Sequence, residues 1–506
     1  MKMNRRVFLK SCVSALGGLG LGGWKATCRA AAGSDEDTHG APPNIVFILA
    51  DDMGYGDIQA YNPASRIPTP NLNQLASDGM RFTDAHSGSA VCTPTRYGIL
   101  TGRYCWRTRL QSGVLFPPDD EPLIEPGRLT VAGMLKRRGY HTACIGKWHL
   151  GIEWGRDDAG TVDFSKPIRH GPTDVGFDEY FGIAASLDMV PYAFYHNRNP
   201  VEPVTETQEA LGFPRFIRQG PKAPGFDPGK VLDTLTERAV GYIRTRARRQ
   251  ERFFLYLPLT APHKPVWPAD RFAGKTAMGP YGDFVHQVDD SVGRVLRAIE
   301  QAGVAGNTLV VYTSDNGSFM YRRPQEIRDH TVDAAKQHYH PDNHQANGSL
   351  RGTKADVWEG GHRIPFVVRW PGRVKPSSEC DQTICLTDFF ATCAEIVRFD
   401  MPPNAGEDSF SLMGLLAGRG WLRAPVVHHS ANGVFALRQG KWKMVFGNGS
   451  GGREQPVGKP FARPYALFDM EQDPSETTNV IESYPQVAAQ LEQALARIRD
   501  NPSSRL

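Results

Sequence analysis

The clearest hydrophobic signal is the unbroken apolar run at residues 44–50, NIVFILA. A run of this kind, with no alternation of polar and apolar positions, is typical of a strand buried on both faces, as in a parallel sheet. The same reasoning predicts further strands at residues 80–86, 140–145, 253–259, 307–313 and 366–370.

Helical patterns separate these strands. Helices are predicted at residues 70–79, 130–138, 230–250, 284–301 and 387–397, and Thr130 and Gly139 suit the two ends of the second one. Residues 152–228 and 318–348 are irregular and are predicted to be long loops. Strands that alternate with helices favour a doubly wound, mostly parallel α/β sheet.

The pattern changes near residue 410, where short alternating stretches replace the long runs. Strands are predicted at residues 425–429, 433–438, 442–446 and 465–469, with a hairpin turn at 438–441 and an amphipathic helix at 485–499. We therefore expect a large α/β domain at residues 42–410. A small α+β subdomain with an antiparallel sheet is expected at residues 411–506.

The first 32 residues have the pattern of an export signal. Arg5 and Arg6 precede a short, Gly-rich apolar run, and small residues follow at 30–32. The paired arginines favour the twin-arginine type, and a plain secretory signal is the alternative. The run is too short for a stable membrane span, so the export machinery is an expected partner and the mature chain is expected to be periplasmic or secreted.

Overall charge adds little specificity. The 506 residues carry a net charge of +4, which argues against a nucleic-acid-binding protein because such proteins concentrate basic residues on one face.

The mature chain retains six cysteines: Cys92, Cys105, Cys144, Cys380, Cys385 and Cys393. Export would permit a disulfide, and Cys380 with Cys385 is the nearest pair in sequence, but the sequence leaves the pairing open.

Polar residues stand where the predicted strands end. They are Asp51, Asp52, Lys147, His149, His263, Asp315 and Asn316. In an open α/β sheet, ligands bind along the edge formed by the carboxyl ends of the strands, so these residues are expected to meet in one crevice. Taken singly, each acid could be a solvated turn residue and each histidine a structural one.

The residue types indicate the chemistry. Asp51, Asp52, Asp315 and Asn316 offer oxygen ligands, which suit Ca²⁺, or less well Mg²⁺, better than zinc. Positive or donor groups are available from Arg96, Lys147, His149, His263 and Lys354. Such a pocket favours an anionic ester, either phosphate or sulfate.

Cys92 is the best candidate nucleophile, although a lone cysteine is more often a buried structural residue. Pro94 fits the first turn of a helix, which places Cys92 at a helix N-terminus with Arg96 one turn along. Four further histidines, His330, His338, His340 and His344, occupy the loop at 318–348. They could bind a transition metal, but a substrate-facing or exposed loop is the simpler interpretation.

The segment from Cys92 to Gly102, C-x-P-x-R-x4-T-G, resembles the signature of the type I sulfatases of the alkaline phosphatase superfamily. The resemblance extends over residues 42–480 through Asp-Asp, Gly-Lys-Trp-His-Leu-Gly, Ala-Pro-His, Ser-Asp-Asn-Gly and Arg-Gly-x-Lys. It lies closest to the arylsulfatase A and N-acetylgalactosamine-6-sulfatase branch. Thr95 stands where the family commonly has Ser or Ala.

The resemblance implies a function and a set of roles. Cys92 would be oxidised to formylglycine (3-oxoalanine) by a formylglycine-generating enzyme, and its hydrate would attack the sulfur of a sulfate ester. The implied calcium ligands are Asp51, Asp52, Asp315, Asn316 and residue 92. Arg96 and His149 would hold the hydrate, and Lys147, Ser186, His263 and Lys354 would bind the sulfate.

His263, with Lys354, would protonate the leaving alcohol, which could belong to an aryl sulfate or to a sulfated sugar or oligosaccharide. Two alternatives stay open on the sequence. One is a phosphoester or phosphonate-ester hydrolase of the same superfamily. The other is a non-catalytic binder of sulfated glycans, if Cys92 is never modified.

Overall fold

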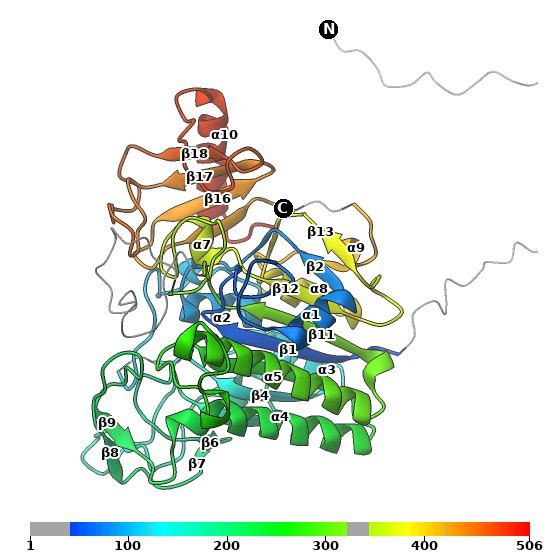
Figure 1. Ribbon diagram of the computed structural model, residues 1–506, viewed down its shortest axis with the longest axis vertical. Coiled ribbons are helices and arrows are strands. Elements are labelled where there is room, and N and C mark those ends of the chain that lie inside the picture. Colours follow the sequence, from blue (N-terminus) through cyan, green and yellow to red (C-terminus); the bar gives the residue numbers. More distant parts are fainter. Residues whose placement is uncertain (1–40, 120, 321–343, 421–422, 506) are drawn as a thin grey trace, which may run out of the picture. The chain divides into compact units, whose positions relative to one another are not determined.

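The computed structural model describes residues 41–119, 121–320, 344–420 and 423–505. The expected export signal and three of the four loop histidines lie outside the described residues. Residues from Pro42 onward form one compact unit. Within the described part of the chain, no helix combines the length and hydrophobicity needed to cross a membrane. The labels below are those of Figure 1.

A ten-stranded sheet forms the centre of the unit, in the order β13-β2-β12-β11-β1-β10-β4-β5-β6-β7 (Figure 1). Its four central strands are β11 (Thr308–Ser314), β1 (Asn44–Asp51), β10 (Phe253–Pro262) and β4 (His141–Lys147). All neighbouring pairs among these four are parallel. Every residue of β1, β10 and β11 is buried, as the unbroken apolar runs predict.

Helices cover both faces of this sheet. Consecutive residues of a strand point to opposite faces, and Phe253 packs on Tyr242 of α4 (Val231–Arg248) whereas Phe254 packs on Phe389 of α8 (Asp388–Ile396). Helix α5 (Gly279–Gln301) lies beside α4. The doubly wound α/β architecture predicted from the sequence is therefore confirmed.

The remaining elements are shorter. The other helices are α1 (Pro70–Ser77), α2 (Cys92–Thr101), α3 (Val131–Arg137), α7 (Glu359–His362), α9 (Met413–Leu416) and α10 (Pro485–Asp500). The other strands are β2 (Met80–Phe82), β3 (Ala85–His86), β5 (Glu179–Ile183), β6 (Tyr195–His196), β7 (Asn199–Pro200), β8 (Glu206–Gln208), β9 (Gly220–Lys222), β12 (Phe366–Arg369), β13 (Ser378–Cys380), β14 (Ile384–Cys385), β15 (Val426–His429), β16 (Phe435–Gln439), β17 (Trp442–Phe446) and β18 (Ala466–Asp469).

Two expectations about the large sheet were wrong. Residues 152–228 are not wholly irregular, because they contain β5, which pairs in parallel with β4. The predicted strand at 80–86 is divided between β2, in the large sheet, and β3, which pairs with β14 in a separate sheet. The chain bends between them at Thr83 and Asp84.

Beyond residue 410, four antiparallel strands form a second sheet in the order β15-β16-β17-β18. Helix α10 packs on this sheet through Leu491, Leu495 and Ile498, which share a core with Leu437 and Met444. These elements match the small antiparallel subdomain expected from the alternating pattern.

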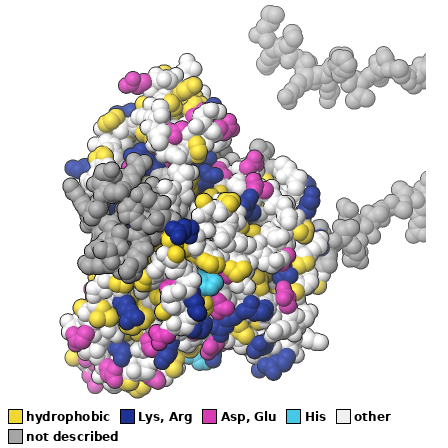
Figure 2. Space-filling model, in the orientation of Figure 1, with side chains coloured by type: hydrophobic (Ala, Val, Ile, Leu, Met, Phe, Trp, Pro, Cys, Tyr) yellow, Lys and Arg dark blue, Asp and Glu magenta, His cyan; other side chains and the backbone are white. Residues whose placement is uncertain are grey.

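Acidic and basic side chains are mixed over the face shown in Figure 2. The six cysteines of the described chain are all unpaired, and this includes Cys380 and Cys385, the pair nearest in sequence.

Candidate active site

The four central strands deliver polar side chains to one edge of the sheet. Asp51 is the last residue of β1 and Lys147 the last of β4, while His263 and Asp315 directly follow β10 and β11. The strands are parallel neighbours, so their carboxyl ends meet. The strand ends that the sequence predicts to lie together therefore meet in the fold, where their side chains are buried.

Cys92 is the first residue of α2, and Pro94 lies in the first turn. All ten residues of this helix are buried, which is unusual for a helix and fixes the position of the thiol. The Cys92 Sγ atom lies 3.5 Å from Asp51 Oδ1 and 3.5 Å from Lys354 Nζ. Residue 92 thus faces both a carboxylate and an ammonium group.

Arg96 joins three of the strand ends. Its Nε and Nη2 groups donate to Asp315 Oδ2 at 3.1 and 2.7 Å, and Nη1 donates to the Lys147 carbonyl at 3.0 Å. Nη2 also lies 3.4 Å from Asp51 Oδ1. The side chain of Arg96 is fully buried, so these contacts hold the guanidinium in one orientation.

Two lysines contact the paired aspartates. Lys147 Nζ donates to both oxygens of Asp51, at 3.0 and 2.8 Å. Lys354 Nζ lies 2.7 and 2.8 Å from the two oxygens of Asp52. His263 Nε2 lies 3.6 Å from Asp52 Oδ2. Together with Arg96, the site therefore places four nitrogen-bearing side chains around two adjacent carboxylates.

The environment of the site shifts the pKa values of its groups. Burial raises the pKa of Asp51, but the charges of Lys147, Arg96 and Lys354 outweigh it and hold the pKa well below its ordinary value. Burial, together with the charge of Asp51, raises the pKa of Asp315 to about 6. Asp51 is therefore the carboxylate that stays ionised most firmly.

Burial raises the pKa of the Cys92 thiol to about 12, against the lowering effect of Lys147 and Lys354. The thiolate is the nucleophilic form of cysteine, so an unmodified Cys92 is a poor nucleophile at neutral pH. Burial and the charge of Lys354 lower the pKa of His263, and burial and Lys147 lower that of His149. Both imidazoles are therefore neutral near pH 7.

The oxygen groups fit a hard cation. Asp52 N–H donates to Asp315 Oδ1 at 3.1 Å, and Asn316 Nδ2 donates to Asp52 Oδ1 at 2.7 Å, which brings Asp52, Asp315 and Asn316 together. Asn316 Oδ1 is buried and has no hydrogen-bond partner among the described residues. Ligand atoms of Asp51, Asp52, Cys92 and His263 lie within 4.8 Å of one another. Carboxylate and amide oxygens in this arrangement suit Ca²⁺ or Mg²⁺.

His149 and Ser186 make no hydrogen bond to the other expected site residues in the described chain. His149 has a φ of 58°, its Nε2 lies 3.0 Å from the Leu115 carbonyl, and its buried Nδ1 has no hydrogen-bond partner in the described chain. Ser186 follows β5, beside the end of β4, and is buried. Its hydroxyl makes no hydrogen bond to any described residue.

Of the four loop histidines, His344 lies in the described chain. His344 is buried and lies 2.8 Å from Asp57 Oδ1, so it is neither exposed nor part of a histidine cluster in the described chain. Asp57 also accepts hydrogen bonds from the hydroxyl of Tyr281 and from the N–H of Gly54. These contacts had no signal in the sequence, because Tyr281 and His344 lie 224 and 287 residues from Asp57 and have no characteristic spacing.

Known proteins resemble this chain over most of its length. A family model described as Sulfatase matches residues 43–398. The N-acetylgalactosamine-6-O-sulfatase of Bacteroides thetaiotaomicron is 31% identical over 509 residues, which cover 93% of this chain and 96% of that protein. Arylsulfatase A of Bos taurus is 33% identical over 500 residues, which cover 94% of this chain and 90% of that protein.

One solved structure comes from work on the metabolism of multiple glycosaminoglycans by Bacteroides thetaiotaomicron. It has a TM-score of 0.79 and 30% sequence identity to this chain. The match covers 91% of this chain and 99% of that one. The family model includes the strand ends and α2, on which the site is built. The chain therefore belongs to the sulfatase family and is a sulfate ester hydrolase.

Proposed function

We propose that this enzyme hydrolyses sulfate esters on sulfated sugars, with residue 92 as formylglycine and with a bound calcium ion. The observation that carries the proposal is the setting of Cys92. It begins a buried helix between Asp51 and Lys354, and its thiol has a pKa raised to about 12. Because the thiol stays protonated at neutral pH, residue 92 needs a nucleophilic group other than a thiolate.

Formylglycine would supply that group, because one hydroxyl oxygen of its hydrate can bond to sulfur, and the second hydroxyl can then lose its proton and re-form the C=O bond as the sulfate leaves with the first oxygen. Arg96 and the neutral His149 would hold the hydrate, and His149 would accept a proton during the expulsion. Arg96 is suited to this role because Asp315 and the Lys147 carbonyl already fix its guanidinium.

Lys147, Ser186, His263 and Lys354 would bind the sulfate. The negative charge of the bound sulfate would favour the protonated form of His263, which, assisted by Lys354, would then protonate the oxygen of the leaving alcohol. Asp51, Asp52, Asp315 and Asn316 would hold calcium together with residue 92. When bound, the ion would neutralise the buried carboxylates and stabilise negative charge that develops on the sulfate oxygens.

The names of the relatives support a sulfated sugar as the substrate, since one is an N-acetylgalactosamine-6-O-sulfatase. The pattern of residues 1–32 supports export to the periplasm by the twin-arginine route. In this proposal a formylglycine-generating enzyme modifies Cys92 during maturation.

The test is a comparison of the wild type with Cys92→Ser and, as the matched control, Cys380→Ser at a half-buried cysteine away from the site. Peptide mass spectrometry of active wild type should show the CH2SH group of residue 92 replaced by CHO. Cys92→Ser should lose multiple turnover on an aryl sulfate, because a serine ester has no second hydroxyl, whereas Cys380→Ser should keep it.

An alkylatable thiol at residue 92 in fully active enzyme would overturn the proposed mechanism. Faster turnover of an aryl phosphate than of the matching aryl sulfate would instead favour a phosphoester hydrolase. Loss of activity after treatment with a calcium chelator, and recovery with Ca²⁺ but not with buffer alone, is the expected result for the metal.

A further inference from the structure

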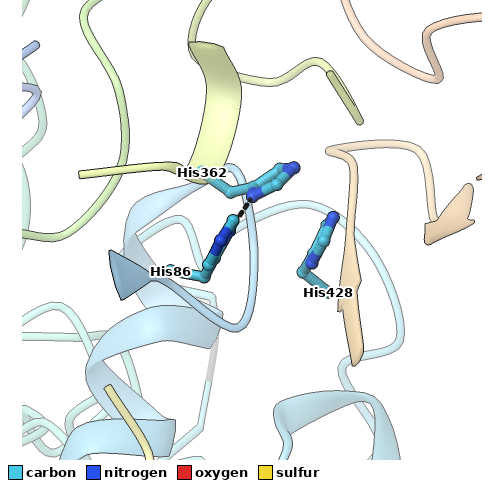
Figure 3. A group of neighbouring side chains, drawn as sticks. All are labelled: His86, His362 and His428. Atoms are coloured by element: carbon cyan, nitrogen blue, oxygen red, sulfur yellow. Dashed lines mark hydrogen bonds between the residues drawn. The ribbon is translucent and has the colours of Figure 1, made fainter. Parts of the chain in front are cut away.

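Three buried histidines meet outside the active site. His86 ends β3, His362 ends α7, and His428 lies in β15 (Figure 3). All three have an exposed fraction of 0%. His86 lies hundreds of residues before the other two, and His362 and His428 belong to a helix and to a strand of the antiparallel sheet. No short sequence motif therefore brings the three together.

The three imidazoles are close enough to share a ligand. His86 Nδ1 lies 3.0 Å from His362 Nδ1, and the two rings point at each other in Figure 3. The ring of His428 lies 3.4 Å from that of His362, measured between centroids, and is stacked on that of His86 at 5.7 Å. One ring nitrogen of each residue falls within 4.8 Å of the others.

The outer nitrogens of two rings face oxygen acceptors. His86 Nε2 lies 2.9 Å from Asp84 Oδ1, and His362 Nε2 lies 3.0 Å from the Val357 carbonyl. Metal-binding histidines usually donate their second N–H to a carboxylate or a backbone carbonyl in this way. If both Nε2 atoms carry hydrogen, the lone pairs of the two Nδ1 atoms face each other, which is favourable only with a cation between them.

A metal-free hydrogen-bond chain is the rival arrangement. Lys443 Nζ lies 3.1 Å from His362 Nε2, so a chain could run from Lys443 through His362 and His86 to Asp84. These hydrogen bonds would provide partners for both ring nitrogens of His86 and of His362. They leave His428 buried with neither ring nitrogen hydrogen-bonded to any described residue, which is unfavourable for a buried polar group.

We propose that His86, His362 and His428 bind a transition-metal ion of the Zn²⁺ type. Neutral imidazole is a preferred ligand of Zn²⁺, and only the metal uses all three rings. The carboxylates of Asp84 and Glu359 lie beside the rings. They also pair with Arg438 and Lys443, so they offset part of the charge that an ion would add. The ion would be separate from the calcium proposed for the active site.

Such an ion would tie the antiparallel sheet to the segment that leads into Cys92. Ser87 N–H donates to the His362 carbonyl at 2.8 Å, and Ala90 N–H donates to the His429 carbonyl at 3.0 Å. The metal would thus fix β3, α7 and β15 at the point where the chain turns toward α2. Its role is structural, and the proposal does not depend on the reaction assigned to the enzyme.

The experiment measures the metal content of the full chain, purified from zinc-supplemented cells, by mass spectrometry of the elements. We expect one zinc ion per wild-type chain. His428→Gln should lose it, whereas His429→Gln, a change at the adjacent buried histidine, should retain it. Asp315→Asn in the active site should also retain zinc, which separates this site from the proposed calcium site.

Two measurements on the wild type keep the proposal testable if His428→Gln does not fold. X-ray absorption at the zinc edge should show imidazole nitrogen ligands, and removal of zinc with a strong chelator should lower Tm, with recovery on adding Zn²⁺. A wild-type chain without zinc or another transition metal would overturn the proposal. Zinc with sulfur ligands, or zinc that His428→Gln retains in full, would overturn it as well.

Discussion

At the scale of single residues, the site is held by buried charges that have few alternative partners. Arg96 and Lys147 contact Asp315 and Asp51, and all four side chains are fully buried. Breaking such a pair leaves a charge without compensation, so the geometry is strongly constrained. The same contacts place Cys92 next to the groups that would bind an anion.

We predict that Arg96→Lys strongly impairs the enzyme although the charge is kept. A lysine cannot reach Asp315 Oδ2 with two N–H groups and the Lys147 carbonyl with a third. We expect kcat on an aryl sulfate to fall about 10²-fold, as when one preorganised donor is removed, and the free energy of unfolding to fall by about 1–3 kcal/mol. Steady-state kinetics and thermal unfolding measure the two effects.

Arg238→Lys is the control, because this arginine is 40% exposed and lies 3.3 Å from Glu179 at the surface. It should leave kcat and Tm almost unchanged. Wild-type kcat in Arg96→Lys would contradict the role assigned to the guanidinium.

Much of this site could be predicted from the sequence, because parallel strands bring their carboxyl ends to one edge. That argument predicts that Asp51, Lys147, His263 and Asp315 lie together. In the structure Lys147 contacts Asp51, and both His263 and Asp315 contact Asp52. The His86, His362 and His428 cluster could not be predicted. Its members depend on the packing of two sheets, and nothing in the local sequence marks that contact.

At the scale of elements, the active-site end of the sheet depends on two glycines that allow strands to approach closely. Gly146 in β4 pairs with Gly182 in β5, and a Cβ on Gly182 would lie 1.8 Å from the Gly146 carbonyl oxygen. Strand β5 was missed because five residues that include a glycine give a weak strand signal. The same glycine is what lets the strand fit there.

We predict that Gly146→Ala destabilises the protein and reduces activity. Its Cβ would lie 1.9 Å from the Pro258 carbonyl oxygen, and φ at this position is 143°, so β4 and β10 would have to separate next to Lys147. We expect a loss of about 1–3 kcal/mol or more in the free energy of unfolding. Chemical denaturation and kcat on an aryl sulfate are the measurements.

Gly139→Ala separates steric crowding from backbone strain. Gly139 has a φ of 80°, but nothing lies within 4 Å of its would-be Cβ. It should cost only about 1–2 kcal/mol for the left-handed conformation and should leave kcat unchanged. Equal kcat in the two alanine variants would contradict the argument that β4 must approach β10 closely to place Lys147.

At the scale of the whole molecule, the antiparallel sheet is joined to the parallel one through buried charges as well as apolar contacts. Lys443 in β17 lies 3.1 Å from Glu359 in α7 and 2.7 Å from Glu476, and Arg438 in β16 lies 3.0 Å from Glu359. The sequence predicted the strands that carry these residues. It gave no sign of the ion pairs, because each partner lies in another sheet or loop.

Glu359 and Glu476 share Lys443, and this has a consequence for stability against pH. Lys443 and Arg438 outweigh burial and hold the pKa of Glu359 well below its ordinary value, whereas burial raises the pKa of Glu476 from 4.5 to about 7. Between pH 4.5 and about pH 7, Glu476 keeps its proton in the folded chain and has lost it in the unfolded chain. Raising the pH from about 4.5 to about 7 therefore lowers stability through this group.

We predict that Glu476→Gln removes this dependence. Relative to the variant, the wild type should lose up to about 1.4 kcal/mol of unfolding free energy per pH unit across that window, measured by denaturation at several pH values. Glu492→Gln, at a surface pair with Arg463, should follow the wild type at every pH. Parallel curves for wild type and Glu476→Gln would mean that Glu476 is already ionised at pH 5, and that the two sheets are joined through two charged glutamates and not one.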